Sequence, residues 1–405
     1  MGLEDNEALN EHGPLGKRIF SVLFLVLFVA TLGLGIVAPL MPVFAESLGA
    51  TGIWLGVIFS GFSISRVIFM PLIGRLSDSR GRKKFITAGL LLYAVLSLLY
   101  PMAGSVYSLV AVRLIHGFAS AMVFPIAMAY VADVSRRGNE GETMGTFNIA
   151  MFLGMGAGPL LGGALKDAFG FPAAFYSMSA LTAVAFLITL FFLPDVVSSG
   201  ARHRRHVPFR KMVESRTMKG ILVFRMVSAM GRGSIMAFLP IIAARYDVTT
   251  TQIGVIISSL VFVTALLQRP FGKLADRFDR VVLVIVGSVI ATLPLFFVPQ
   301  MKGFVKLFIL GGFVGLGSAV AMPSASAISV VVGQRIGMGA TMGLFTSAMS
   351  VGMIVAPILS GIVMDMFGIG SVFYVSGTLS AVGVFFFYLL LSGEEMPGIR
   401  YSEDV

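Results

Sequence analysis

Residues 74–83 read GRLSDSRGRK, and the stretch 198 residues further on, at 272–280, reads GKLADRFDR. Each follows a long apolar run and puts a glycine, an acid and basic residues into a short polar loop. Glycine permits the close approach of two helices, and an acid is stabilised at the N-terminus of a neighbouring helix. One copy would fit a charged turn as well as a conformational latch, but the recurrence favours a latch.

The same offset relates the two halves of the chain. Residues 117–176 align with 315–374 without a gap, and the matches include proline, glycine and aspartate as well as common apolar residues. Chance similarity between apolar helices does not keep these three residue types in one register, so the chain contains two copies of one unit. The matched pairs include Pro125/Pro323, Gly145/Gly343, Pro159/Pro357 and Asp167/Asp365.

Twelve apolar runs reach about 20 residues, the length that crosses the core of a bilayer. They predict an all-α membrane protein of twelve transmembrane helices in two six-helix repeats, which are parallel because six is an even number of crossings. Parallel repeats place the substrate at the repeat interface near the middle of the membrane. The predicted parts are a cytoplasmic N-terminal tail at 1–17, a six-helix bundle at 18–194, a basic cytoplasmic linker at 195–218, a second bundle at 219–392 and a cytoplasmic C-terminal tail at 393–405.

The composition excludes several classes of protein. Of the 405 residues 57% are hydrophobic and 12% charged, whereas soluble domains carry about a quarter of charged residues. The chain has no cysteine and only four histidines, which leaves no nucleophile–base pair or metal cluster. It also has no Walker loop. We therefore expect a protein that is not an enzyme, has no cofactor or metal, and is driven by an ion gradient, of protons.

The net charge of +10 is mostly a signal of membrane orientation. With the N-terminus inside, 21 Lys and Arg fall in cytoplasmic segments and 4 in outer loops, an excess that the positive-inside rule requires. This predicts cytoplasmic N- and C-termini in the plasma (inner) membrane of a prokaryote. We expect the basic linker to lie near anionic membrane lipids, and we expect no nucleic-acid partner.

With these features the chain resembles the major facilitator superfamily over essentially its whole length, and residues 74–83 match the family signature between spans two and three. The resemblance implies that Asp78 holds the outward-open state by engaging the end of helix eleven, with a relay that includes Arg82 and Asp133. The second copy departs from the signature at Phe278 and Asp279. The predicted latch residues are Gly74, Asp78, Arg82, Asp133, Gly272 and Asp276.

Span five carries glycines with the spacing G-x8-G-x3-GP-x2-GG. Such a helix has a small-residue face for tight packing, and its proline permits bending. The pattern resembles the signature of drug:proton antiporters, which implies a role in the direction of exchange and in limiting leak. The sequence LGLGIVAPLMP at 32–42 resembles the twelve-span branch of that group, which includes multidrug and tetracycline exporters. The motif residues are Gly145, Gly154, Gly158, Pro159, Gly162 and Gly163.

Five arginines lie within the predicted spans, whereas all twenty acids fall in loops or at span ends. An unpaired charge in mid-membrane costs about 2.5–3.5 kcal/mol on insertion scales, so such residues are candidates for function. Arg225 and Arg269 are close enough to the cytoplasmic ends for their side chains to snorkel. Arg66, Arg113 and Arg232 lie deeper.

The predicted substrate and coupling residues are Arg66, Arg113, His116 and Arg232, with Arg66 and Arg232 facing the transport cavity. The resemblance implicates Arg113 in proton coupling. Since an arginine does not release its proton, its role would be to bias a nearby acid or an anionic substrate. A histidine ordinarily titrates near neutral pH, so His116 is either part of the coupling or a packed, hydrogen-bonded residue.

Together these features predict a monomeric secondary transporter that works by alternating access. It would export a hydrophobic or amphiphilic small molecule in exchange for protons and so confer drug resistance. No acid lies between Arg18 and Glu46, which favours neutral, zwitterionic or anionic cargo over cationic drugs. The alternative is an organic-anion carrier or exchanger whose arginines bind a carboxylate or phosphate.

Overall fold

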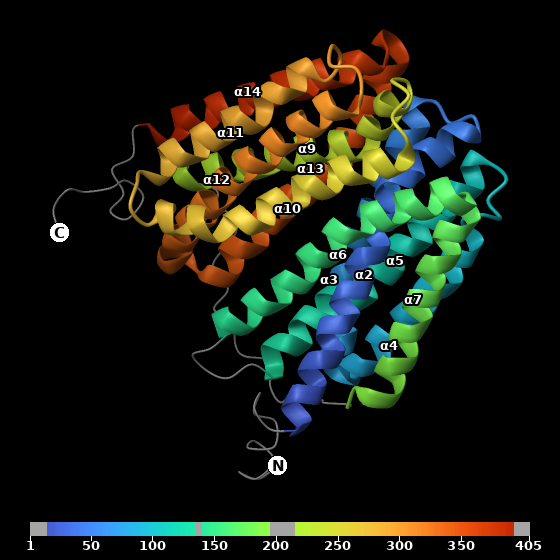
Figure 1. Ribbon diagram of the computed structural model, residues 1–405. Helices are drawn as coiled ribbons and strands as arrows, with labels where there is room; N and C mark the ends of the chain where they lie inside the picture. Colours follow the sequence, from blue (N-terminus) through green and yellow to red (C-terminus); the bar gives the residue numbers. More distant parts are fainter. Residues whose placement is uncertain (1–13, 135–139, 195–214, 393–405) are drawn as a thin grey trace. The chain divides into compact units, whose positions relative to one another are not determined.

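The computed structural model describes residues 14–134, 140–194 and 215–392. Both predicted tails lie almost wholly outside these residues, as does most of the predicted linker. Within them the chain forms twelve helices and no strand. The predicted all-α fold of twelve helices is therefore confirmed, and most predicted spans lie inside a longer helix (Figure 1).

The described residues form two compact units. One contains residues 14–49 and 61–194, and the other contains 50–60 and 215–392. The first unit therefore includes all but the first nine residues of α3. Its helices are α2 (Pro14–Ser47), α3 (Gly52–Arg80), α4 (Arg82–Leu99), α5 (Val106–Val134), α6 (Glu140–Phe169) and α7 (Phe171–Phe192).

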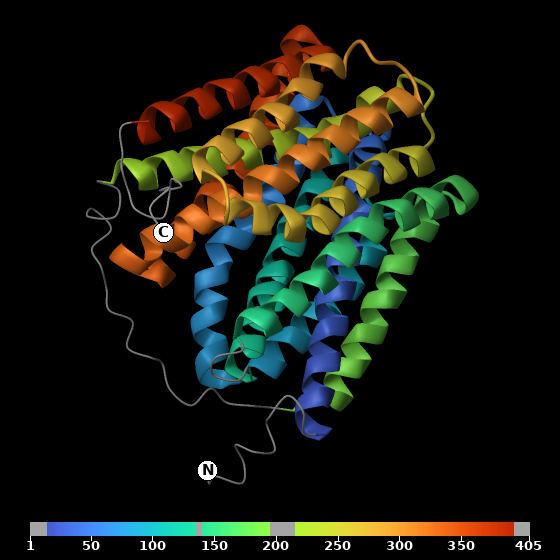
Figure 2. The ribbon, with the colours of Figure 1, turned by 60° about the vertical axis from the view of Figure 1, so that its left-hand side comes forward.

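The second unit repeats this order of six helices (Figure 2). They are α9 (Arg216–Ala244), α10 (Thr250–Ala275), α11 (Arg280–Phe297), α12 (Phe304–Ile336), α13 (Met338–Phe367) and α14 (Ile369–Leu391). The packing repeats as well. In the first unit α2 packs on α6 and α7, and α4 packs on α5 and α7. The counterparts 198 residues later, α9 with α13 and α14 and α11 with α12 and α14, make the same contacts.

Eleven of the twelve helices are long and apolar enough to cross a membrane. The exception among the described residues is α4, which has 18 residues and begins with Arg82, Lys83 and Lys84. These three charges occupy its first turn, and α4 ends at Leu99. Its apolar stretch is therefore shorter than the predicted span 85–104. The difference arises because the polar signature enters the helix instead of forming a loop before it.

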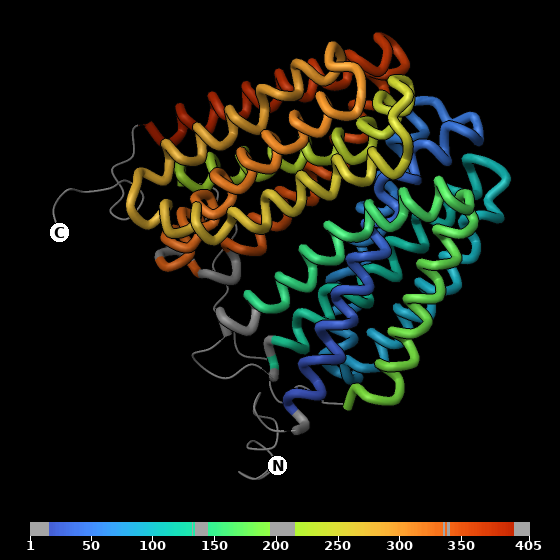
Figure 3. The backbone as a smooth tube through the Cα atoms, viewed as in Figure 1, coloured from blue at the N-terminus to red at the C-terminus, as the bar shows by residue number. Residues whose placement is uncertain are grey.

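Single glycines separate several consecutive helices. Gly170 and Gly368 stand at matched positions of the two repeats, with φ of 84° and 85°. Each ends one helix and begins the next, so α6 runs into α7 and α13 into α14 without a loop (Figure 3). A φ in this region is accessible to glycine at little cost and strained for other residues. The connections between α6 and α7 and between α13 and α14 are therefore sharp corners at one glycine.

Within the second unit, the start of α3 packs on α13. The carboxylate of Asp365 accepts hydrogen bonds from the backbone N–H groups of Gly52 (2.6 Å) and Ile53 (2.8 Å). A Cβ on Gly52 would meet the carbonyl oxygen of Gly361 at 2.4 Å, so the backbones touch here. Further along, the Ser60 hydroxyl donates to the Ile354 carbonyl (2.6 Å). Asp365 thus caps a helix whose remainder belongs to the other unit.

Candidate functional site

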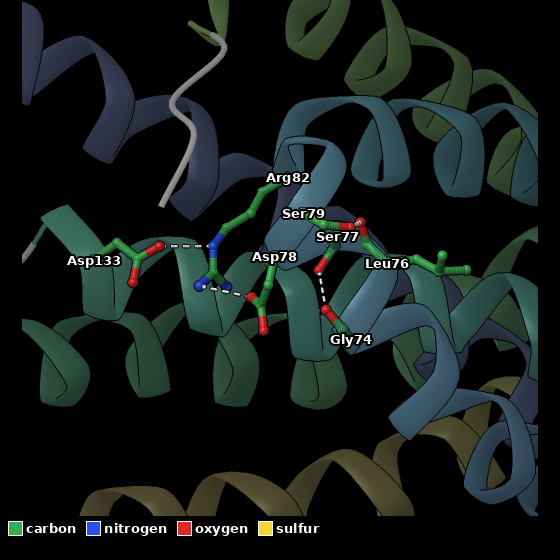
Figure 4. A network of polar contacts seen from close by, with 7 residues as sticks. All are labelled: Gly74, Leu76, Ser77, Asp78, Ser79, Arg82 and Asp133. Atoms are coloured by element: carbon green, nitrogen blue, oxygen red, sulfur yellow. Dashed lines mark hydrogen bonds and ion pairs between the residues drawn. The ribbon is translucent and has the colours of Figure 1, made fainter. Parts of the chain in front are cut away.

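The first copy of the latch is assembled around Arg82. Gly81, with φ of 90°, ends α3 and lets α4 begin one residue later. This corner places Arg82 Nη2 3.2 Å from Asp78 Oδ1, while Arg82 Nε lies 2.7 Å from Asp133 Oδ2 at the end of α5 (Figure 4). The Arg82 side chain is 7% exposed and that of Asp78 is 60% exposed. One buried cation therefore joins α3, α4 and α5.

The predicted engagement of Asp78 with helix eleven would connect the two units and stays a prediction. We predicted that Gly74 lets two helices approach closely, and the described residues of the first unit show no such approach at Gly74. A Cβ on Gly74 would meet no atom within 4 Å. Gly74 instead contributes its carbonyl oxygen, which accepts a hydrogen bond from the Ser77 hydroxyl at 2.8 Å.

The second copy of the latch is simpler. Asp276 caps the end of α10, and Arg280 Nη2 lies 3.5 Å from its Oδ1. Asp279, at the position of Gly81, accepts hydrogen bonds from the N–H groups that begin α11. Val331 stands where the first repeat has Asp133, so the carboxylate at that position is not repeated. Near Gly272, the only atom a Cβ would meet is in Pro323, at 4.0 Å.

The glycines of the span-five motif form a contact face against α2. A Cβ on Gly154 would meet the carbonyl oxygen of Phe28 at 2.5 Å, and one on Gly158 would meet that of Leu32 at 2.5 Å. Gly162 approaches the backbone of Ile36 in the same way. A Cβ on Gly145 would meet nothing within 4 Å, so the packing face begins at Gly154. The role of the motif in exchange stays a prediction.

The motif prolines and small residues meet at the centre of this contact. A Cβ on Gly35 of α2 would lie 2.9 Å from Pro159 Cδ and 2.9 Å from Gly158 Cα. The glycines of span one and span five are therefore two sides of one close helix crossing. In the second unit the corresponding contact is looser, since Gly233 faces Ala356 Cβ at 3.4 Å.

Arg113 and His116 lie together on α5 in the interior of the first unit. The Tyr100 hydroxyl is 2.6 Å from His116 Nδ1. The Arg113 guanidinium lies 4.6 Å from the centre of the Phe62 ring, a cation–π distance. Arg113 is 4% exposed and His116 is 0% exposed. The cluster therefore holds one cation among aromatic rings.

The surroundings of His116 match the packed alternative. The rings of Tyr93 and Phe62 meet the imidazole edge-on, with centroid distances of 4.4 Å and 5.7 Å. Its Nε2 has no hydrogen-bond partner among the described residues. The structure thus encloses His116, and its predicted role in coupling stays a prediction.

Arg66 belongs to the same region of the first unit. It lies on α3, half-buried, with its guanidinium 5.3 Å from the centre of the Phe124 ring on α5. It is also within electrostatic range of Tyr93. The structure therefore brings three of the four predicted substrate and coupling residues, Arg66, Arg113 and His116, close to Tyr93.

Arg232 is separate from that cluster and lines a cavity inside the second unit. The cavity is partly open, has a volume of about 70 Å³ and is lined by residues of α9, α10, α11, α12 and α14. This cavity lies within one bundle, and the prediction that Arg232 faces the transport cavity stays a prediction. No Asp, Glu or Lys lines it.

Arg225 does not behave as predicted. Its guanidinium lies 4.7 Å from the centre of the Phe345 ring, and Nη1 and Nη2 lie 3.2 Å from Met322 Sδ and 2.8 Å from Met349 Sδ. The side chain therefore turns into the bundle and does not extend to the cytoplasmic end. Rings and polarisable sulfurs attract it inward. Arg269 is exposed, and its predicted snorkelling to the cytoplasmic end stays a prediction.

The sequence did not single out Tyr93, Tyr100 or Phe62, although all three contact the predicted residues. Aromatic residues are common in apolar spans, and nothing in their spacing marks these. Tyr100 carried one usable signal, because it is a phenol within a span that contains few other hydrogen-bonding groups.

Comparisons with known proteins identify the family of the chain. A family model described as Major Facilitator Superfamily matches residues 23–227 and 221–404. The MFS-type transporter MJ1560 of Methanocaldococcus jannaschii is 30% identical over 378 residues, which are 91% of this chain and 97% of the relative. Multidrug resistance protein 2 of Bacillus subtilis is 28% identical over 381 residues, 91% of this chain and 94% of the relative.

The fold also matches a solved structure. A bacterial homologue of the human lysosomal transporter Spinster, in an inward-facing and unoccupied conformation, is similar with a TM-score of 0.82. The match covers 95% of this chain and 99% of the other at 13% identity. This match concerns the fold alone, because the two proteins share too little sequence identity.

Proposed function

Because the chain belongs to the major facilitator superfamily, we propose that it is a proton-coupled exporter of amphiphilic small molecules that are neutral, zwitterionic or acidic. The family makes it an integral membrane transporter of small molecules and not an enzyme. The finer features of the proposal are the direction of transport, the driving ion and the chemical class of the substrate.

The placement of charge carries the proposed substrate class. Arg113 and Arg232 lie in the interiors of the two units, whereas each described Asp and Glu lies in a loop or within about one turn of a helix end. A cationic substrate would meet positive charge at both places without a carboxylate to offset it. An acidic or neutral substrate meets no such penalty.

Export is supported by the relatives and by the span-five motif. One relative is named a multidrug resistance protein, and the glycine face of α6 has the spacing of drug:proton antiporters. Close backbone contact between α2 and α6 leaves no space along that crossing for water or ions. This suits a transporter in which leak must be prevented while protons and substrate exchange.

Arg113 is our candidate for the coupling residue. It cannot itself give up a proton, but its charge favours an anion nearby and disfavours a second cation. The Phe62 ring lies 4.6 Å from its guanidinium, and the Tyr100–His116 hydrogen bond belongs to the same buried cluster. Binding of an acidic substrate or movement of a proton close to Arg113 would then alter the same electrostatic field, which is the requirement for coupling two ligands.

A second candidate is an organic-anion exchanger that does not use protons. The observation favouring it is Arg232, whose cavity contains hydroxyl groups and no carboxylate. In this alternative the two arginine regions bind the acid group of the substrate, and a second anion returns in its place.

Transport into proteoliposomes distinguishes these proposals. The purified chain is reconstituted with and without an imposed pH gradient, and uptake of an amphiphilic carboxylate is compared with that of a cationic dye. We expect pH-driven flux of the carboxylate, which Arg113→Ala abolishes and the exposed-site control Arg269→Gln preserves. Flux of the cationic dye would refute the substrate class. Flux that is independent of pH would establish the exchanger, and unchanged flux in Arg113→Ala would refute the coupling role.

The remaining features of the proposal follow from the charge pattern. We propose a monomer in a prokaryotic inner membrane, with both termini cytoplasmic and the basic linker at the surface of anionic lipids. Alternating access, in which one bundle rocks against the other, moves the substrate.

A further inference from the structure

The cavity around Arg232 is polar along one side and apolar on the other. Arg232 lies 16 residues after the start of α9 and 12 before its end, which is about 24 Å and about 18 Å along the helix. Ser228 lies one turn earlier on the same face, and Thr292 and Ser380 join it from α11 and α14. Phe224, Leu260 and Leu295 supply apolar wall.

These polar groups are available to a ligand. The structure contains no hydrogen-bond partner for the hydroxyls of Ser228, Thr292 and Ser380 among the described residues, nor an ion-pair partner for Arg232. Two other hydroxyls of the wall are already used, because Ser288 and Ser318 donate to the carbonyls of Val284 and Val314. What is available is therefore one guanidinium, a donor of five N–H bonds, and three hydroxyls.

The carboxylates of this unit do not balance the charge of Arg232. Asp276 lies beside Arg280, Asp279 caps α11, and Asp365 caps the start of α3. Asp247, the other acid among residues 215–392, lies in the turn after α9. A cation inside a bundle with no carboxylate in its cavity is costly. An anion bound in the cavity would offset this charge.

The volume limits what part of a ligand fits. About 70 Å³ holds roughly five water-sized groups, since a water needs about 10–15 Å³. A carboxylate or phosphate group with a few carbon atoms fits this space, whereas a whole drug-sized molecule does not. The head of an amphiphile can thus meet Arg232 while the first part of its chain contacts Phe224, Leu260 and Leu295.

We propose that the Arg232 cavity is a binding site for the acidic headgroup, carboxylate or phosphate, of a single-chain amphiphile. The guanidinium would bind two oxygens of the acid in parallel, the geometry that suits arginine. Hydroxyls of Ser228, Thr292 and Ser380 would donate to the remaining lone pairs. The inference deepens the proposed function, because such an acid would be the head of the exported molecule, yet binding itself needs no gradient.

Calorimetric titration of the full-length protein in nanodiscs of phosphatidylcholine tests the site. Octyl phosphate is the probe, and octyltrimethylammonium and inorganic phosphate are the comparisons. We expect octyl phosphate to bind, and Arg232→Gln to weaken that binding about tenfold to a hundredfold, the usual range for losing hydrogen bonds to a charged group. Arg269→Gln, which removes an exposed arginine of the same unit, should bind as the natural protein does.

A second variant tests the site without removing the charge of Arg232. Ser228→Leu leaves Arg232 in place and fills the cavity, so it should also abolish binding of octyl phosphate. Unchanged binding in Arg232→Gln or in Ser228→Leu would overturn the proposal, as would equal binding of octyltrimethylammonium. Inorganic phosphate that binds as tightly as octyl phosphate would overturn the amphiphile as the ligand.

A last arm identifies the source of the headgroup. The titration is repeated in nanodiscs of phosphatidylglycerol. Competition there would assign the cavity to a two-chain anionic membrane lipid and overturn the single-chain amphiphile as its ligand, whereas no competition supports the free amphiphile. Binding without pH-driven transport would leave the site established and refute the proposed function, whereas transport of the carboxylate without binding in the cavity would do the reverse.

Discussion

The close crossing of α2 and α6 makes a strong prediction about one methyl group. In Gly158→Ala the new Cβ would lie 2.5 Å from the Leu32 carbonyl oxygen and 2.7 Å from Gly35 Cα. Both are backbone atoms, so neither can rotate away. Ordinary contact begins at 3.4 Å, and the two helices would therefore have to separate by about 0.9 Å.

Overpacking of this kind costs about 1–3 kcal/mol, and the better helix propensity of alanine recovers about 0.5–1 kcal/mol. At the middle of these two ranges, we expect Gly158→Ala to lose about 1 kcal/mol of stability. Gly145→Ala is the matched control, because it makes the same change in the same helix where a Cβ meets nothing within 4 Å. It should keep or raise the stability by up to about 1 kcal/mol.

The measurement is the fraction of monodisperse protein that survives heating, followed by size-exclusion chromatography in one detergent. The apparent melting temperature of Gly158→Ala should fall below that of the natural protein, and that of Gly145→Ala should not. Equal melting temperatures for the two variants would show that α2 and α6 are not in backbone contact and would refute the reasoning.

Three further substitutions are tested by the same heating assay. Asp133→Asn removes the closer of the two carboxylates that pair with the buried Arg82 and leaves the exposed Asp78, so it should cost about 1.5–3 kcal/mol; a smaller loss than in Asp78→Asn would contradict the assignment. Tyr100→Phe removes the partner of His116 Nδ1 and should cost about 1–3 kcal/mol, and a melting temperature equal to the natural one would argue against that bond. Asp365→Ala uncaps the start of α3 and should cost about 0.5–2 kcal/mol. An unchanged melting temperature would disprove this prediction.

Much of the fold could be predicted because its signals are long and repeated. Runs of apolar residues define the helices, and matched glycines and prolines define the two repeats. The prediction was least accurate at α4, since hydropathy alone does not show that Arg82, Lys83 and Lys84 belong to a helix. The corner at Gly81 decides this, and the conformation of one glycine cannot be read from composition.

The candidate site was predicted in part. Charge in an apolar span identifies Arg113 and Arg232 as unusual, and the structure places both inside bundles. The sequence could not show which way an arginine turns, so Arg225 was assigned to the cytoplasmic end although methionine sulfurs and Phe345 hold it inside. Side-chain partners from distant helices, such as Tyr100 for His116, depend on packing that no local pattern encodes.

The corners at Gly170 and Gly368 also record the history of the chain. They occupy the same position in both halves and share one backbone conformation, as two descendants of a single six-helix ancestor would. At Gly81 and Asp279 the halves instead differ, one turning through a glycine and the other capping its helix with a carboxylate. The duplicated halves therefore kept the corner between their last two helices and diverged at the one that carries the latch.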